Sequence, residues 1–160
     1  MSYIVCVITN NDKNVIDLFS EYMNQYDNIC IIYSDNINID KKINIPQLLK
    51  LLPNSYDSLQ LFTHNATQII HLLEYNPNDL IIHKEKNYEG EYITLYSSNY
   101  IQRIYENIKK YKKIPNEITE NNYILTIPLF TLKSHTENET TNRIIRHIML
   151  MHKKHIAFLI

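Results

Sequence analysis

The chain has 160 residues and a net charge of −1 at pH 7, and it contains a single glycine, Gly90. Ordinary composition supplies about 11 glycines at this length. Phosphate-binding loops, dinucleotide fingerprints and nucleophile elbows each need several glycines at fixed offsets, because their backbone approaches a ligand closely or turns with positive φ. The composition therefore excludes these classes of enzyme site.

Isoleucine (27), asparagine (20), lysine (13) and tyrosine (13) supply 73 of the 160 residues. These residue types have A/T-rich codons, so we expect an AT-rich genome, such as that of a large DNA virus, a parasite or an intracellular bacterium. The sequence shows neither an apolar run of about 18 residues nor the pattern of a secretion signal at its start, so we expect no membrane contact and a cytoplasmic protein, of a cell or of an infected host cell.

The first elements form the clearest unit. Residues 3–8 are a continuous apolar run, which predicts a strand covered on both faces, and residues 29–33 predict a second one. A helix between them has one apolar face, formed by Val15, Leu18, Phe19, Tyr22, Met23 and Tyr26. Strand, helix and strand in this order predict a right-handed crossover and parallel pairing.

Residues 34–45 are interpreted as a loop or short hairpin inserted outside the core. A short helix opening at Pro46 follows. Residues 59–62 predict a strand, Asn65 can cap the next helix, and residues 80–82 predict another short strand.

The second half continues the alternation. Residues 92–96 predict a strand, and Ser97 or Ser98 begins a helix. Residues 123–132 predict a long strand in which Pro128 requires an edge or a bend. A capping box, Thr136 with Glu139 or Ser134 with Glu137, precedes the next helix, and residues 156–160 predict a terminal strand.

The expected fold is an α/β three-layer sandwich with a mostly parallel sheet, Rossmann-like or flavodoxin-like, in one domain over residues 1–160. Its strands are expected near residues 3–8, 29–33, 59–62, 80–82, 92–96, 123–132 and 156–160.

Polar residues follow most of these strands. Ligands of parallel α/β sheets bind beyond the carboxyl ends of the strands, where the connecting loops meet. The residues expected there are Thr9, Asn10, Asp12, Asp35, His64, His83, Lys84, Ser97 and Ser98. If the protein is an enzyme, we expect a small hydrolase or transferase that uses Asp12, Asp35, His64 and His83.

Other chemistry has weaker support. No HExxH, CxxC or HxH pattern is present, so we expect no metal and no cofactor. Cys6 and Cys30 are interpreted as free, buried thiols. The lysines near residue 110 suit the carboxyl end of a helix. Nucleic-acid binding would require one shared face for Arg103, Lys109, Lys113, Lys153 and Lys154.

One stretch resembles a known family. Residues 59–85, LQLFTHNATQIIHLLEYNPNDLIIHKE, are similar to the strand, helix and strand that end at the phosphoacceptor of response-regulator receiver domains. In that family an apolar strand leads into an acceptor aspartate, whereas here Asp79-Leu80-Ile81-Ile82 leads into His83-Lys84. The resemblance implies a degenerate receiver that is not phosphorylated at this position and acts through protein contacts, with Asp12 the sole candidate for the acidic metal pair.

The absence of catalytic motifs and the uneven charge, −5 in residues 1–80 and +4 in residues 81–160, favour a non-catalytic protein-interaction or assembly domain. Such a domain is expected to bind a protein partner or to form a homo-oligomer, as a subunit of a larger viral or secretory complex or as a receiver-like domain.

Overall fold

The structure is a computed structural model, and it describes residues 1–9, 15–75, 78–115, 117–133 and 138–160. Within these residues a mixed sheet of six strands has the order β1-β2-β5-β3-β6-β4. The strands are β1 (Tyr3–Ile8), β2 (Asn28–Tyr33), β3 (Ser58–Gln60), β4 (Ile81–His83), β5 (Ile93–Ser97) and β6 (Asn122–Leu125).

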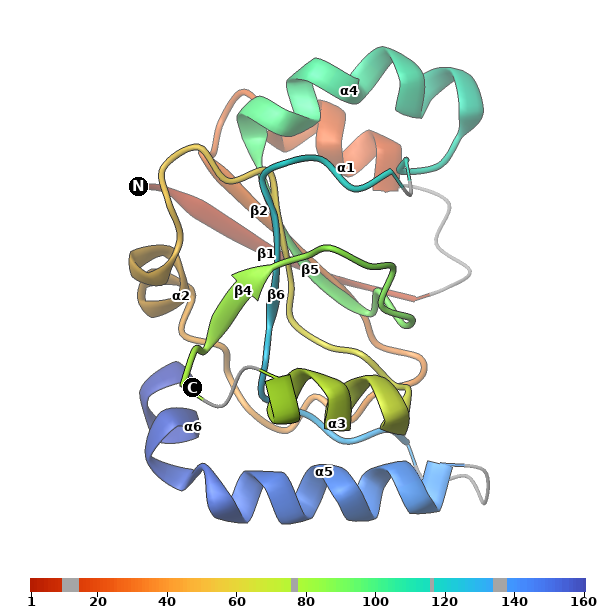
Figure 1. The fold of residues 1–160 in the computed structure, drawn as a ribbon. Coiled ribbons are helices and arrows are strands. Elements are labelled where there is room, and N and C mark those ends of the chain that lie inside the picture. Colours follow the sequence, from red (N-terminus) through yellow and green to blue (C-terminus); the bar gives the residue numbers. More distant parts are fainter. Residues whose placement is uncertain (10–14, 76–77, 116, 134–137) are drawn as a thin grey trace.

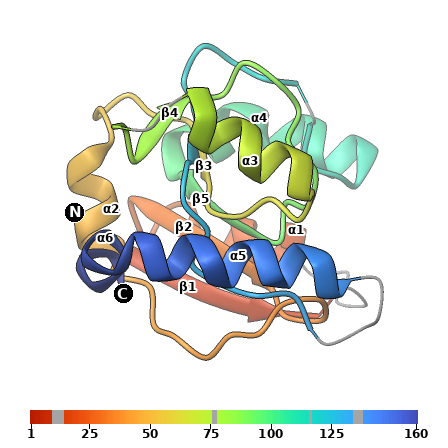
Figure 2. The same cartoon turned by 60° about the horizontal axis from the view of Figure 1, so that its bottom comes forward.

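Helices cover both faces of the sheet, and the predicted α/β sandwich is confirmed (Figure 1). The helices are α1 (Val15–Tyr22), α2 (Ile45–Leu51), α3 (Ala66–Tyr75), α4 (Ser98–Tyr111), α5 (Glu139–Met151) and α6 (Lys153–Leu159). Helices α1 and α4 form one layer, and α2, α3, α5 and α6 form the other, onto which Figure 2 looks. Among the described residues, none of the helices has both the length and the apolar content of a bilayer-crossing segment.

The strand directions are more mixed than expected. The pairs β1–β2 and β3–β6 are parallel, whereas β2–β5, β3–β5 and β4–β6 are antiparallel. Strands β1, β2, β3 and β6 therefore run one way, and β4 and β5 run the other way. Residues 84–92, which connect β4 to β5, contain no helix, and such a short connection does not supply a parallel crossover.

Strand β2 lies at the centre of the packing. Its side chains alternate between the two helical layers, with Ile29 and Ile31 packed towards α1 and α4, and Cys30 and Ile32 packed towards the other layer. Five of its six residues are buried. This continuous burial matches the uninterrupted apolar run that the sequence shows.

Strand β1 differs from the prediction, which placed it under cover on both faces. It is an edge strand, because only β2 pairs with it in the described chain. Its side chains Tyr3, Val5 and Val7 are exposed, and its register places them on the same face as Cys30 and Ile32 of β2. The residue types indicated a strand but could not show that one face lacks a covering helix.

The predicted terminal strand at 156–160 is wrong, because residues 153–159 form helix α6. Its two buried residues, Ile156 and Leu159, are three positions apart, which is helical spacing. The backbone N–H of Asn44, the residue that caps α2, donates to the carbonyl of Leu159 at 2.8 Å. A short apolar run does not distinguish a strand from a buried helix, and here packing against α2 selected the helix.

Two further segments also differ from expectation. Of the predicted strand 123–132, only residues 123–125 belong to the sheet, in β6 (Asn122–Leu125), and Pro128 lies in the irregular chain that follows. Of the predicted insertion at residues 34–45, residues 34–44 form a loop and Ile45 begins α2, but Ile37 and Ile43 are buried in the core rather than outside it. The isolated bridge between Ile37 and Leu132 explains this difference, because it joins the two irregular segments across the core. The predicted capping boxes at Ser134 and Thr136 lie outside the described residues.

The buried cysteine of β2 generates a testable prediction. Burial raises the pKa of the Cys30 thiol to about 12, with a smaller contribution from Cys6. We expect Cys30 to resist a maleimide at pH 8 in the folded protein and to react once urea unfolds it. Since the folded thiol stays protonated between pH 9 and about 12 while the unfolded thiol ionises, stability should fall as pH rises through this range.

Urea titrations of the wild type and Cys30→Val at pH 7, 9 and 10.5 measure this contribution. The loss should be smaller in the variant. Labelling of Cys30 at equal rates in folded and unfolded protein would contradict the burial on which the prediction rests.

Candidate functional site

The carboxyl ends of β1, β2, β3 and β6 lie at one end of the sheet, and two predicted site residues are found there. Asp35 follows β2 and His64 follows β3. Tyr92 connects the two loops, since the backbone N–H of Tyr33 donates to its carbonyl at 2.7 Å and the His64 ring stacks on its ring with centroids 5.4 Å apart. Asn10 and Asp12 lie outside the described residues. This end of the sheet therefore carries two of the four residues expected of an enzyme site.

His83 is not at this end of the sheet. Strand β4 runs antiparallel to β6, so its carboxyl end lies at the opposite end of the sheet, where His83 Nε2 contacts the carbonyl of Glu120. Ser97 is the last residue of β5, another reversed strand, and Ser98 follows it. Both lie at that same opposite end of the sheet, where the Ser98 hydroxyl donates to the carbonyl of Tyr26. The expected grouping of His83 with His64 is therefore wrong, because it assumed that all of these strands were parallel.

His64 packs against the sole glycine. Gly90 has φ of 82°, and a Cβ built on it would collide with Nδ1 of His64 and lie 3.0 Å from Cγ. The His64 Nε2 atom lies 3.7 Å from a carboxylate oxygen of Glu89, and the buried Nδ1 atom has no hydrogen-bond partner among the described residues. Glycine is required here both by the backbone conformation and by the close approach of the ring.

The turn that holds Gly90 is tied to the start of α3. The Thr63 hydroxyl donates to the carbonyl of Glu89 at 2.9 Å, and the Glu89 backbone N–H donates to the side chain of Gln68 at 2.9 Å. Asn65 caps α3 as predicted, accepting from the backbone of Thr67 at 3.0 Å. These contacts give the polar residues after β3 a structural role.

A second polar cluster lies on the sheet face towards α4, over the strands that this helix does not cover. The register places Thr94 of β5 beside Gln60 of β3, and Ser58 of β3 beside Asn122 of β6. The side-chain amide of Asn122 donates to the Ser58 hydroxyl at 2.5 Å. This part of the face is thus lined with hydrogen-bonding groups.

Lys84 is the charged member of this cluster. Its side chain is 8% exposed, and Nζ donates to a carboxylate oxygen of Glu91 at 3.2 Å. Gln60, 1% exposed, donates to the carbonyls of Phe62 and Tyr88, while its own Oε1 has no hydrogen-bond partner within the described parts of the chain. Lys84 was noted from the sequence as a residue following a strand, but its burial was not foreseen.

The cluster encloses little space. Its side chains surround a cavity of about 20 Å³, whereas sites for small organic ligands occupy roughly 300–1,000 Å³. Burial raises the pKa of the Tyr96 phenol, which lines this cavity. The arrangement is therefore that of a polar core, too closed to admit an organic substrate.

A buried carboxylate anchors the chain that covers this cluster. Asp57, just before β3, has a side chain only 3% exposed and pairs with the guanidinium of Arg103 on α4. The hydroxyl of Thr119 donates to the second carboxylate oxygen of Asp57 at 2.6 Å. The backbone N–H of Asp57 donates to the carbonyl of Asn121. Sequence reasoning missed Asp57, although an aspartate directly before an apolar strand was a usable signal.

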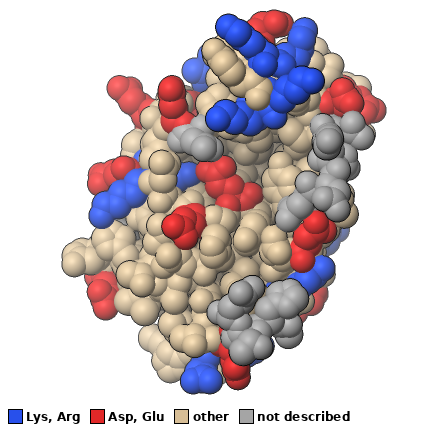
Figure 3. All heavy atoms as spheres, turned by 90° about the vertical axis from the view of Figure 1, so that its right-hand side faces the viewer, with Lys and Arg blue, Asp and Glu red and all other residues tan. Residues whose placement is uncertain are grey.

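The basic residues do not form one surface. Lys109 and Lys113 lie with Lys110 and Lys112 at the exposed carboxyl end of α4. Figure 3 shows basic side chains gathered at the top of the molecule in that view. Lys153 and Lys154 belong to α6, in the layer on the other side of the sheet, and Arg103 pairs with Asp57. The shared face that nucleic-acid binding would require is therefore not formed.

Larger hollows exist on the surface. One of about 330 Å³ lies at the amino end of β2 and is lined mainly by amides, hydroxyls and apolar groups, including Tyr56 and Gln102. Another of about 600 Å³ borders β4 and includes His71, Asp79 and His83. Neither contains Asp35 or His64, and in the described part of the chain three or more metal-binding side chains do not cluster anywhere.

Comparison with known proteins yields no match: neither a family model, nor a curated protein, nor a solved structure is significantly similar to this chain. The receiver resemblance of residues 59–85 stays a prediction.

The packing of Gly90 against His64 predicts the effect of a methyl group there. Gly90→Ala should lower the free energy of unfolding by about 1–3 kcal/mol for the backbone conformation alone, with the collision adding to this loss. In a His64→Ala background the same substitution should cost less, because only the backbone term persists. Chemical denaturation of the four variants of this cycle measures the difference, and equal costs in both backgrounds would refute the contact.

The Lys84–Glu91 pair predicts unequal effects from its two members. Glu91→Gln leaves the buried Lys84 ammonium without its counter-charge and should cost about 1–3 kcal/mol of stability. Lys84→Met should cost less, because the Glu91 carboxylate is 44% exposed and stays solvated. Adding Glu91→Gln to Lys84→Met should then have little further effect. Denaturation curves of the three variants test this order. A larger loss of stability from Lys84→Met than from Glu91→Gln would contradict it.

Proposed function

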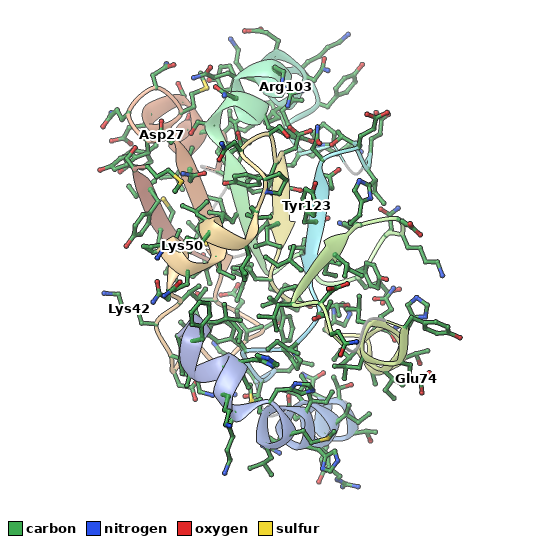
Figure 4. The ribbon with its side chains drawn as sticks, turned by 60° about the vertical axis from the view of Figure 1, so that its left-hand side comes forward. Asp27, Lys42, Lys50, Glu74, Arg103 and Tyr123 are labelled. Carbon is green, nitrogen blue, oxygen red and sulfur yellow. The ribbon has the colours of Figure 1, made fainter. Side chains whose placement is uncertain are left out.

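We propose that this chain is a non-catalytic assembly domain that binds another protein by adding a strand of that protein to the outer edge of β1. The single observation that carries the proposal is the state of this edge strand. Strand β1 has six residues, pairs with β2 along its whole length, and has no second partner strand in the described chain (Figure 4).

The unpaired edge of β1 offers backbone N–H and C=O groups to another strand. Proteins whose edge strands stay single protect them with charged side chains, prolines, bulges or a covering segment. The sequence of β1, YIVCVI, contains no charge and no proline, and its register with β2 runs without interruption from Tyr3 to Ile8. Strand addition to such an edge is a recurrent mode of protein recognition.

The exposed face of β1 adds apolar contacts to this edge. Tyr3, Val5 and Val7 are 38%, 40% and 57% exposed, and all three point to the same face. Isolated exposed apolar side chains are ordinary, but three successive ones on one strand form a row. An added strand with apolar residues at every second position would pack those side chains beside this row.

The other edge of the sheet is different. Strand β4 has only three residues, one of them His83, and the exposed charged residues Glu85 and Lys86 follow it closely. Shortness and flanking charge are the usual protections of an edge strand. The contrast supports β1 as the binding edge.

Two features support a role without catalysis. The enclosed polar cluster around Lys84 is too small for an organic substrate. The residues proposed for a hydrolase or transferase lie at opposite ends of the sheet, with Asp35 and His64 at one end and His83 at the other. A degenerate receiver-like domain, which the resemblance of residues 59–85 implies, would likewise act through protein contacts.

The proposal predicts the effect of one charge on this edge. Val7→Lys places a cation in the exposed row, and because Val7 is 57% exposed the substitution should leave folding intact. Tagged protein recovered from its own source should carry a stoichiometric protein partner in the wild type and lose it in the variant. Mass spectrometry of the recovered material, after washing at moderate salt, measures the difference.

The matched control is Leu150→Lys, an equivalent change at a residue of α5 that is 63% exposed. This variant should keep the partner. Loss of the partner from both variants, or from neither, would contradict binding at β1.

A further inference from the structure

We infer that the strand added at β1 is β1 of a second copy of this chain, in antiparallel orientation about a two-fold axis that passes beside Val5. This inference rests on the proposed function and specifies its partner. It joins two sheets edge to edge through the β1 strands.

Charge is the first argument for a second copy. In a two-fold contact each surface meets itself, so every charge near the axis lies close to an identical charge. A surface with charge of one sign would repel a copy of itself at close range, as at the carboxyl end of α4, which carries four lysines. The strand β1 carries no charge, so it can pair with itself without opposing like charges.

The register is the second argument. Side chains directly opposite each other in an antiparallel pair point to the same face, so a two-fold pair aligns odd-numbered residues with odd-numbered residues. With Val5 facing Val5 of the second copy, Tyr3 faces Val7 and Val7 faces Tyr3. All three exposed apolar side chains then have an apolar partner across the interface.

In each neighbouring register one residue of the row faces a position outside β1. A shift by two residues in one direction places Val7 opposite Met1, which precedes the strand, and a shift in the other direction places Tyr3 opposite Thr9, which follows it. Cross-strand pairs of aromatic and β-branched residues contribute roughly 0.2–1 kcal/mol each, so the register that forms three such pairs is favoured.

This geometry predicts which cysteines can cross-link. Directly opposite residues of an antiparallel pair have Cα atoms about 4.5–5.5 Å apart, within the range of a disulfide. A cysteine at position 5 would face itself across the axis. A cysteine at position 7 would be four residues, or about 14 Å, from its own copy along the strand direction, too far for a disulfide.

The experiment oxidises purified Val5→Cys, Val7→Cys and wild-type protein under mild conditions and separates the products by non-reducing electrophoresis. Val5→Cys should give a covalent dimer, and Val7→Cys and the wild type should stay monomeric under the denaturing conditions of the gel. Because Val7 is the more exposed of the two, random collisions would link Val7→Cys at least as well. Equal cross-linking of the two variants therefore overturns the register.

Sedimentation equilibrium of the wild type separates this inference from the proposed function. A dimer that Val7→Lys dissociates and Leu150→Lys leaves intact supports self-pairing. A monomer that fails to link through Val5→Cys overturns self-pairing. If that monomer still binds a different protein that Val7→Lys releases, strand addition at β1 stands without it, and if it binds none, both ideas fail.

Discussion

Burial of β2 on both faces is the constraint from which the rest of the structure follows. Its side chains Ile29 and Ile31 belong to one core, and Cys30 and Ile32 belong to the other, so this strand must lie between two helical layers. Strands β1 and β5 then occupy its two sides. The helices that cover β2 leave Tyr3, Val5 and Val7 of β1 exposed, and the edge strand is the natural consequence of this arrangement.

The opposite half of the sheet is organised by polar contacts. Beyond β5, the face towards α4 carries Gln60 and Asn122, and the chain that follows α4 is held over it by Asp57 and Thr119. Buried polar groups of this kind are stable only when they are paired, and they fix one arrangement of the strands that carry them. The charged pair Asp57 and Arg103 of this half thus stabilises the fold, and the uncharged strand β1 lies at the far edge of the sheet.

The local patterns of the sequence predicted much of this fold. The α/β class, the strand at residues 3–8, the helix capped by Asn65 and the helix that begins at Ser98 were all foreseen, because each has a clear periodicity or cap. The terminal run at 156–160 was misread, since a short apolar run fits a strand or a buried helix equally well. Strand direction could not be predicted, because it depends on which strands pair.

The candidate sites were harder to predict for the same reason. His83 was grouped with His64 on the assumption of parallel strands, and reversal of β4 separates them. The contact between Gly90 and His64 joins residues 26 positions apart, and composition alone identified the glycine without its partner. Exposure of β1 was likewise invisible, because an apolar run reads the same at the centre and at the edge of a sheet.

Amide hydrogen exchange of β1 tests the central claim most directly. In an edge strand every second backbone N–H points away from β2, and in dilute protein these amides should exchange rapidly while the inward-pointing ones are protected. We expect the outward-pointing amides of residues 3–8 to become protected as protein concentration rises, in step with dimer formation. Rapid exchange of these amides at every concentration, in protein that is demonstrably associated, would place the interface elsewhere and contradict the account.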